Sequence, residues 1–122
     1  MKKIFAVMAV LALLSLGGIR FAGADPVQWS TSVGGNDHWY EAVYVPTFIT
    51  WPVADVAATS AGGYLATLTS EAENEFAYNL VLDEKFWDYA PNGVCCNGPL
   101  IGGYQDFNAP DYSEPGGGWQ WV

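Results

Sequence analysis

Residues 50–81 decide the fold, and they read TWPVADVAATSAGGYLATLTSEAENEFAYNLV. This stretch predicts two helices joined by a short extended link. Thr50 is a candidate N-cap, and Pro52 follows in the first turn, where its missing N–H is not needed by the helix. Small and apolar residues then recur at helical spacing at Trp51, Ala54, Ala58 and Ala61. Gly62 and Gly63 supply the left-handed conformation at which helices commonly end.

The second helix has the clearest start signal in the chain. Ser70 and Glu73 form a capping box, in which the hydroxyl accepts from the Glu73 amide and the carboxylate returns to the Ser70 amide. The predicted buried stripe consists of Ala72, Phe76 and Leu80, with Ala77 and Val81 beside it. Glu71, Glu73 and Glu75 place negative charge at the positive end of the helix dipole. A metal or sugar site is the alternative interpretation of these acids, but capping and the dipole already account for them.

Towards the N-terminus, residues 38–45 are rich in Trp, Tyr and Val and predict a strand that ends before Pro46. Residues 25–35 are polar and end at a turn signal over residues 34–37. We therefore expect residues 25–35 to be a lead-in to the domain.

Towards the C-terminus, residues 83–99 contain several turn-forming dipeptides and are expected to be irregular. Residues 100–104 predict a short strand, in which Gly102 and Gly103 allow a close backbone approach. A polar loop over residues 105–118 follows. Trp119-Gln120-Trp121-Val122 then begins a further strand that places both tryptophans on one face.

The first 24 residues have the features of a secretory leader. Lys2 and Lys3 precede an apolar stretch over residues 4–16, and the small residues Ala22-Gly23-Ala24 suit signal peptidase. The apolar stretch is short for a membrane span, which needs about 20 residues, and Arg20 interrupts it. We expect cleavage after Ala24, a secreted product that is not inserted in the membrane, and no role for residues 1–24 in the fold. An uncleaved N-terminal anchor is the alternative.

Composition excludes several classes of function. The chain has 122 residues with 13 acidic and four basic side chains, a net charge of −9. After removal of residues 1–24, Lys85 is the only Lys or Arg against 13 acids, so the charge becomes −12 over 98 residues. This charge argues against nucleic acid as a partner. The two cysteines and one histidine leave almost no material for a zinc site or a Cys/His catalytic pair. The length of the chain predicts one domain. No nucleophile–base pair is visible in the sequence, so we expect that the protein is not an enzyme.

Three pieces of this sequence resemble the C-type lectin-like domain family, in particular secreted bacterial-type members. Residues 62–74 look like the link between the family's two helices. Residues 100–103 look like its W-I-G strand, with Leu100 in place of the usual Trp. Residues 119–122 look like its W-x-W strand, which opens a small upper sheet. The resemblance covers residues 36–122 and implies an α+β fold, with two helices flanking a mostly antiparallel sheet.

The resemblance also implies that the family's ligand site is not within this chain. In the family, an E-P-N-type motif and then W-N-D follow the W-x-W strand, and their oxygens bind calcium and sugar. Those motifs would lie after Val122. We therefore expect the chain to be C-terminally truncated, lacking the long loop region and the closing strands. No cofactor is expected within it, although calcium is possible in a full-length protein. Glu114-Pro115 is followed by Gly116 and precedes the W-x-W strand, so we interpret it as part of a loop.

The two cysteines depart from the family pattern, because neither predicted helix contains one. Cys95 and Cys96 are adjacent and can join only through a strained ring. A vicinal disulfide, pairing with cysteines beyond Val122, bridging between molecules and a redox-active pair are the options. Their place in a loop favours pairing with sequence beyond Val122.

Other candidate residues have simpler structural interpretations. His38 begins a strand beside aromatic residues and has no identifiable catalytic partner. Four acids could bind a cation, but their spacing matches no compact calcium loop: Asp37, Asp106, Asp111 and Glu114. The six tryptophans could stack on sugar rings, yet most are expected in the core: Trp29, Trp39, Trp51, Trp87, Trp119 and Trp121.

The function implied by the resemblance is recognition outside the cytoplasm, with carbohydrate as the expected ligand in the full-length protein. The alternative is a calcium-independent module for protein–protein contact or adhesion on the same fold. The expected partners are accordingly a glycan or the surface of an extracellular protein.

Overall fold

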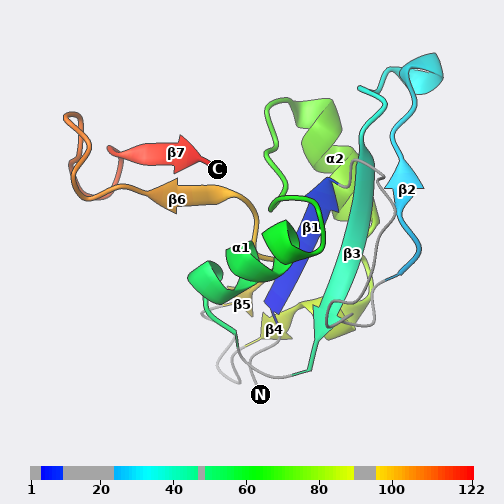
Figure 1. Ribbon diagram of the computed structural model, residues 1–122, viewed down its shortest axis with the longest axis horizontal. Coiled ribbons are helices and arrows are strands. Elements are labelled where there is room, and N and C mark those ends of the chain that lie inside the picture. The colour runs from blue at the N-terminus through cyan, green and yellow to red at the C-terminus, as the bar shows by residue number, and fades with distance from the viewer. Residues whose placement is uncertain (1–3, 10–23, 47–48, 90–95) are drawn as a thin grey trace.

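Figure 1 shows the computed structural model of the chain, which describes residues 4–9, 24–46, 49–89 and 96–122. These residues form an α+β fold with two α-helices, a three-stranded antiparallel sheet and two short antiparallel strand pairs. The predicted fold class, with two helices and antiparallel strands, is confirmed at this level.

The three-stranded sheet has β3 (Trp39–Val45) at its centre, between β1 (Ile4–Ala9) and β2 (Val27–Gln28). β1 and β2 both run antiparallel to β3. The pairing of β1 with β3 extends from Ile4 opposite Val45 to Ala9 opposite Tyr40, whereas β2 contributes two pairs. The strand predicted over residues 38–45 is confirmed to within one residue.

The N-terminal segments differ from the expectation. Residues 4–9 were predicted to lie in a leader outside the fold, but they form β1. The expected lead-in over residues 25–35 contributes β2 and a short 3-10 helix (Thr31–Val33). The segment contains Ile4, Phe5 and Val7, residue types that favour strands, and its backbone pairs with one edge of β3. Pairing of β1 with β3 does not test cleavage after Ala24, which stays a prediction.

Helix α1 (Trp51–Ser60) begins and ends close to where the sequence predicts. Pro52 lies in its first turn, and Gly62 follows the helix with a left-handed φ of 87°. The side chain of Thr50 makes no capping hydrogen bond, so only the backbone position of the predicted cap is correct. Ala54 and Ala58 are buried, as their spacing predicts.

Helix α2 (Glu71–Asn79) has the predicted cap with one difference. The hydroxyl of Ser70 accepts from the Glu73 amide at 3.1 Å. The Glu73 carboxylate does not return to Ser70; it accepts from the Thr69 amide at 2.8 Å and from the Thr69 hydroxyl at 3.0 Å. The predicted buried stripe is wrong at Ala72, which is exposed, because Glu73 takes its place facing the core.

Two clusters of buried side chains form the core. One joins β3 to the segments around α2 and consists of Tyr40, Ala42, Ala66, Val81 and Phe86. The other lies under α1 and consists of Ala54, Ala58 and Leu65. The link between the helices contributes Ala66 to the first cluster and Leu65 to the second, so it connects the two parts of the core.

Residues 83–99 are more regular than expected. They include a 3-10 helix (Glu84–Phe86) and the antiparallel pair β4 (Asp88–Tyr89) and β5 (Cys96–Asn97). The strand predicted over residues 100–104 starts later, as β6 (Gly103–Gln105). Gly102 provides the close approach that was expected, since a Cβ there would lie 2.7 Å from the Leu65 carbonyl oxygen.

Candidate functional site

The β6–β7 hairpin carries two exposed tryptophans on one of its faces. β7 (Trp119–Trp121) pairs antiparallel with β6, placing Trp121 opposite Gly103 and Trp119 opposite Gln105. In Figure 1 the hairpin and its connecting loop extend away from the three-stranded sheet. Because side chains alternate along a strand, Trp119 and Trp121 share one face with Gly103 and Gln105.

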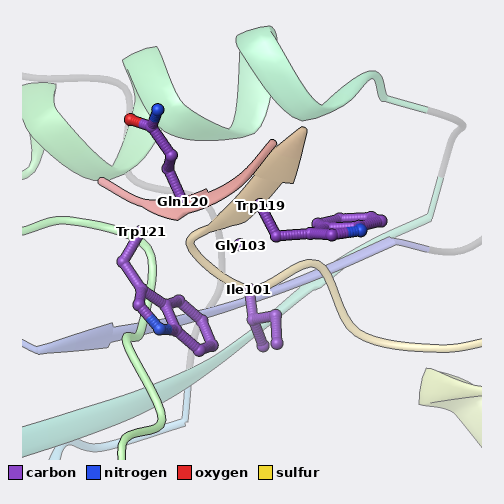
Figure 2. A pocket seen from close by; sticks show the side chains of 5 residues that line it. All are labelled: Ile101, Gly103, Trp119, Gln120 and Trp121. Carbon is purple, nitrogen blue, oxygen red and sulfur yellow. The ribbon is translucent and has the colours of Figure 1, made fainter. Parts of the chain in front are cut away.

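Both tryptophans are open to solvent. The exposed fraction of Trp119 is 60% and that of Trp121 is 43%. They flank a pocket of about 300 Å³ whose other lining residues are Ile101, Gly103 and Gln120. Figure 2 shows the two indoles and Ile101 around this space, with Gln120 leaving the strand on another side. The tryptophan face is thus a shallow, mainly apolar surface.

Gly103 shapes the floor of the pocket. A Cβ at this position would lie 3.5 Å from the nearest atom of the Trp121 ring, which is ordinary van der Waals contact. The Trp121 indole therefore lies over Gly103 across the hairpin. A larger side chain at residue 103 would occupy space that is now open beside the ring.

Polar groups fix the hairpin and its aromatic rings. The Trp119 indole N–H donates to the Pro115 carbonyl oxygen at 3.1 Å. The side-chain amide of Gln105 donates to the Gly117 carbonyl oxygen at 2.9 Å. On the opposite face, the Tyr104 hydroxyl donates to Gln120 at 3.2 Å. The Gln105 amide thus lies on the tryptophan face, whereas the Gln120 side chain leaves from the opposite face.

The hairpin is anchored to α1 through Trp51. Its indole N–H donates to the Ile101 carbonyl oxygen at 2.8 Å, and its ring packs against Tyr104 with centroids 5.4 Å apart. These contacts hold the start of β6 against the helix. The aromatic face is therefore presented by a fixed support rather than by a free loop.

The connecting loop adds a second aromatic pair. Phe107 is 68% exposed and meets Tyr112 edge to face, with ring centroids 5.4 Å apart. The Tyr112 hydroxyl donates to Glu114 at 2.9 Å, and this hydrogen bond to a carboxylate raises the pKa of Tyr112. Glu114 therefore has a structural partner in the loop.

The candidate cation ligands do not form a cluster. Within the described ranges, no group of three or more His, Cys, Asp and Glu side chains is placed to hold a metal ion. Asp37 bonds to Thr31, and Asp106 bonds to the Asn108 amide. Glu73, from the acidic start of α2, is buried and fully engaged with neighbouring side chains.

The remaining sequence candidates are not brought to the hairpin. The backbone amide of His38 donates to the side chain of Asn36 at the start of β3. Cys95 lies outside the described residues, and Cys96 is described only as part of β5. The state of this cysteine pair therefore stays a prediction.

The expectation that most tryptophans lie in the core holds for half of them. Trp29 and Trp87 pack against the first core cluster, and Trp51 packs against the second. Three others are exposed instead: Trp39, Trp119 and Trp121. The alternation in Trp-Gln-Trp correctly places two indoles on one face, but alternation cannot tell which face is covered.

Comparison with known proteins does not identify the chain: no protein-family model, curated protein or solved structure matches it. None of the helices in the described ranges is long and apolar enough to cross a membrane.

Proposed function

We propose that the chain is a C-type lectin-like recognition module that acts outside the cytoplasm and binds carbohydrate on the exposed tryptophans of the β6–β7 hairpin. The pair of exposed indoles beside the pocket carries the proposal. The apolar C–H face of a sugar ring packs well on the electron-rich face of an indole. The side-chain amide of Gln105 lies on the same face of the hairpin as both indoles and can meet the ring's hydroxyl groups.

The acidic charge of the chain limits which glycans the proposed site can bind. Thirteen acids against four basic residues repel anionic glycans. Asp106, Asp111 and Glu114 lie in the loop of the same hairpin and strengthen this effect locally. The proposed ligand is therefore a neutral or cationic glycan, bound without calcium.

Binding of a neutral polysaccharide tests the proposal. Affinity is measured from the retardation of the protein in gels that contain the polysaccharide. Trp121→Ala should lower this affinity about tenfold, because one stacking surface is lost. Trp39→Ala is the matched control, since Trp39 is 39% exposed but lies on β3, away from the hairpin. Binding that is unchanged in Trp121→Ala and Trp119→Ala, or that is abolished by a chelator, would contradict the proposal.

Contact with an extracellular protein is the second candidate function. The exposed Phe107 and its partner Tyr112 extend the aromatic surface of the hairpin into the loop. Tryptophan and tyrosine are enriched at the centres of protein interfaces. A role in adhesion predicts that Phe107→Ala weakens attachment to a protein surface. If the ligand is a sugar, Trp121→Ala should weaken binding more than Phe107→Ala does.

A further inference from the structure

Strand β3 has the character of a central strand. Its buried residues occur at both odd and even positions, so both faces of the strand are covered: Tyr40, Ala42, Val43 and Val45. It contains no proline and a single charged residue, Glu41. Edge strands are normally protected by charges, prolines, bulges or shortness. β3 has seven residues and little of this protection, so it needs a neighbour on each side.

One side of β3 is covered by β2 and by the residues just before it. Val27 and Gln28 pair with it, and the Ala24 amide donates to the Ala42 carbonyl oxygen at 3.1 Å. The other side is covered by β1 alone, through six residue pairs from Ile4–Val45 to Ala9–Tyr40. Figure 1 shows β1 alongside β3 over most of its length.

No other strand in the described ranges is free to replace β1. The remaining strands have two or three residues each, and they pair elsewhere as β4 with β5 and β6 with β7. β1 itself belongs to the segment that the sequence predicts to be removed after Ala24. Cleavage would therefore leave the backbone groups along one edge of β3 without partners.

We propose that this edge of β3 is a strand-acceptor site. In the uncleaved chain it holds residues 4–9, and after cleavage it takes an extended segment of a partner polypeptide, added antiparallel to the sheet. The seated segment, Ile-Phe-Ala-Val-Met-Ala, defines the chemistry of the partner: about six apolar residues without charge or proline. The acidic mature chain favours a partner whose flanking residues are basic, as Lys2 and Lys3 are here. This proposal rests on the predicted cleavage and is independent of sugar binding.

The whole chain, produced without export so that residues 1–24 are retained, allows a direct test. Ala6→Pro together with Val7→Pro removes two consecutive N–H groups. Consecutive amides of a strand point to opposite sides, so one of the two must face β3. Amide hydrogen exchange of residues 39–45 should accelerate by at least about tenfold in this variant. Amides of α2 serve as the internal reference for an intact fold.

A peptide then tests acceptance in trans. Residues 2–9 as the free peptide KKIFAVMA should restore slow exchange in residues 39–45 of the double-proline variant. The same peptide with prolines at the two positions is the matched control and should restore nothing. Unchanged exchange of β3 in the variant, or failure of the native peptide to restore it, would overturn the proposal. Protection that returns without peptide as the protein concentration rises would assign the edge to a second copy, which also overturns it.

Discussion

The carboxylate of Glu73 joins three segments that are far apart in the sequence. Its Oε1 accepts from the Tyr40 hydroxyl at 2.6 Å and from the Asn36 amide at 3.1 Å. Its Oε2 accepts from the backbone and hydroxyl of Thr69. Burial alone would raise the pKa of Glu73, but these hydrogen bonds together outweigh it and lower the pKa. Burial and the bond to the carboxylate raise the pKa of Tyr40.

The first prediction concerns this buried carboxylate. Glu73→Gln should lower the free energy of unfolding at pH 7 by about 1–3 kcal/mol, because one oxygen becomes an NH₂ group that faces other donors. The folded pKa of Glu73 is lower than its unfolded value of about 4.3, so its stabilisation is present above that pH. It is lost as the pH falls through the folded pKa. Urea titrations at pH 7 and pH 3 measure this difference.

Glu75→Gln is the matched control, because Glu75 is exposed on the same helix. Its effect should be small at both pH values. Equal losses for the two variants at pH 7, or a loss for Glu73→Gln that persists undiminished at pH 3, would contradict the role assigned to Glu73.

At the scale of elements, the helix starts can be compared directly. Ser70→Ala should destabilise the protein by about 0.5–2 kcal/mol, because the Glu73 amide loses its acceptor. Thr50→Ala should cost less, since the Thr50 side chain makes no capping hydrogen bond at α1. Denaturant titration of both variants checks this prediction. An unchanged free energy of unfolding in Ser70→Ala would show that the capping hydrogen bond does not stabilise α2.

The sequence was informative where structure is set locally. The starts of the two helices, the capping hydroxyl of Ser70 and the turn at Gly62 all depend on neighbouring residues, and each was predicted within about one residue. The burial of Glu73 was not predicted, because its partners Asn36 and Tyr40 lie more than 30 residues away. The same reason explains β1, whose pairing with β3 joins segments about 35 residues apart.

The candidate site shows the same division. Two tryptophans on one face of a C-terminal strand follow from alternation, and the strand is present. Their exposure depends on which elements cover the hairpin, and the local sequence does not determine that packing. The anchoring of Ile101 by the Trp51 indole is likewise a long-range contact between α1 and the start of β6.

At the scale of the whole molecule, the predicted cleavage after Ala24 should change stability. The product with residues 25–122 lacks β1, so the edge of β3 loses its hydrogen-bond partners. Domains are stable by only about 5–15 kcal/mol, so loss of one strand from a three-stranded sheet should remove much of that margin. Calorimetry should therefore give a lower and broader melting transition for the product than for an uncleaved chain, with mass spectrometry identifying each form.

Ala24→Tyr provides the uncleaved chain, because signal peptidase requires a small residue at this position. Millimolar calcium should leave the melting temperature of both forms unchanged, since the described residues contain no cluster of acids placed to hold the ion. Equal melting temperatures of the two forms would mean that β1 contributes little to the fold. A rise with calcium that a chelator reverses would mean that a complete cation site exists within the chain, and the calcium-independent sugar binding proposed for the hairpin would then have to be replaced by a metal-assisted mode.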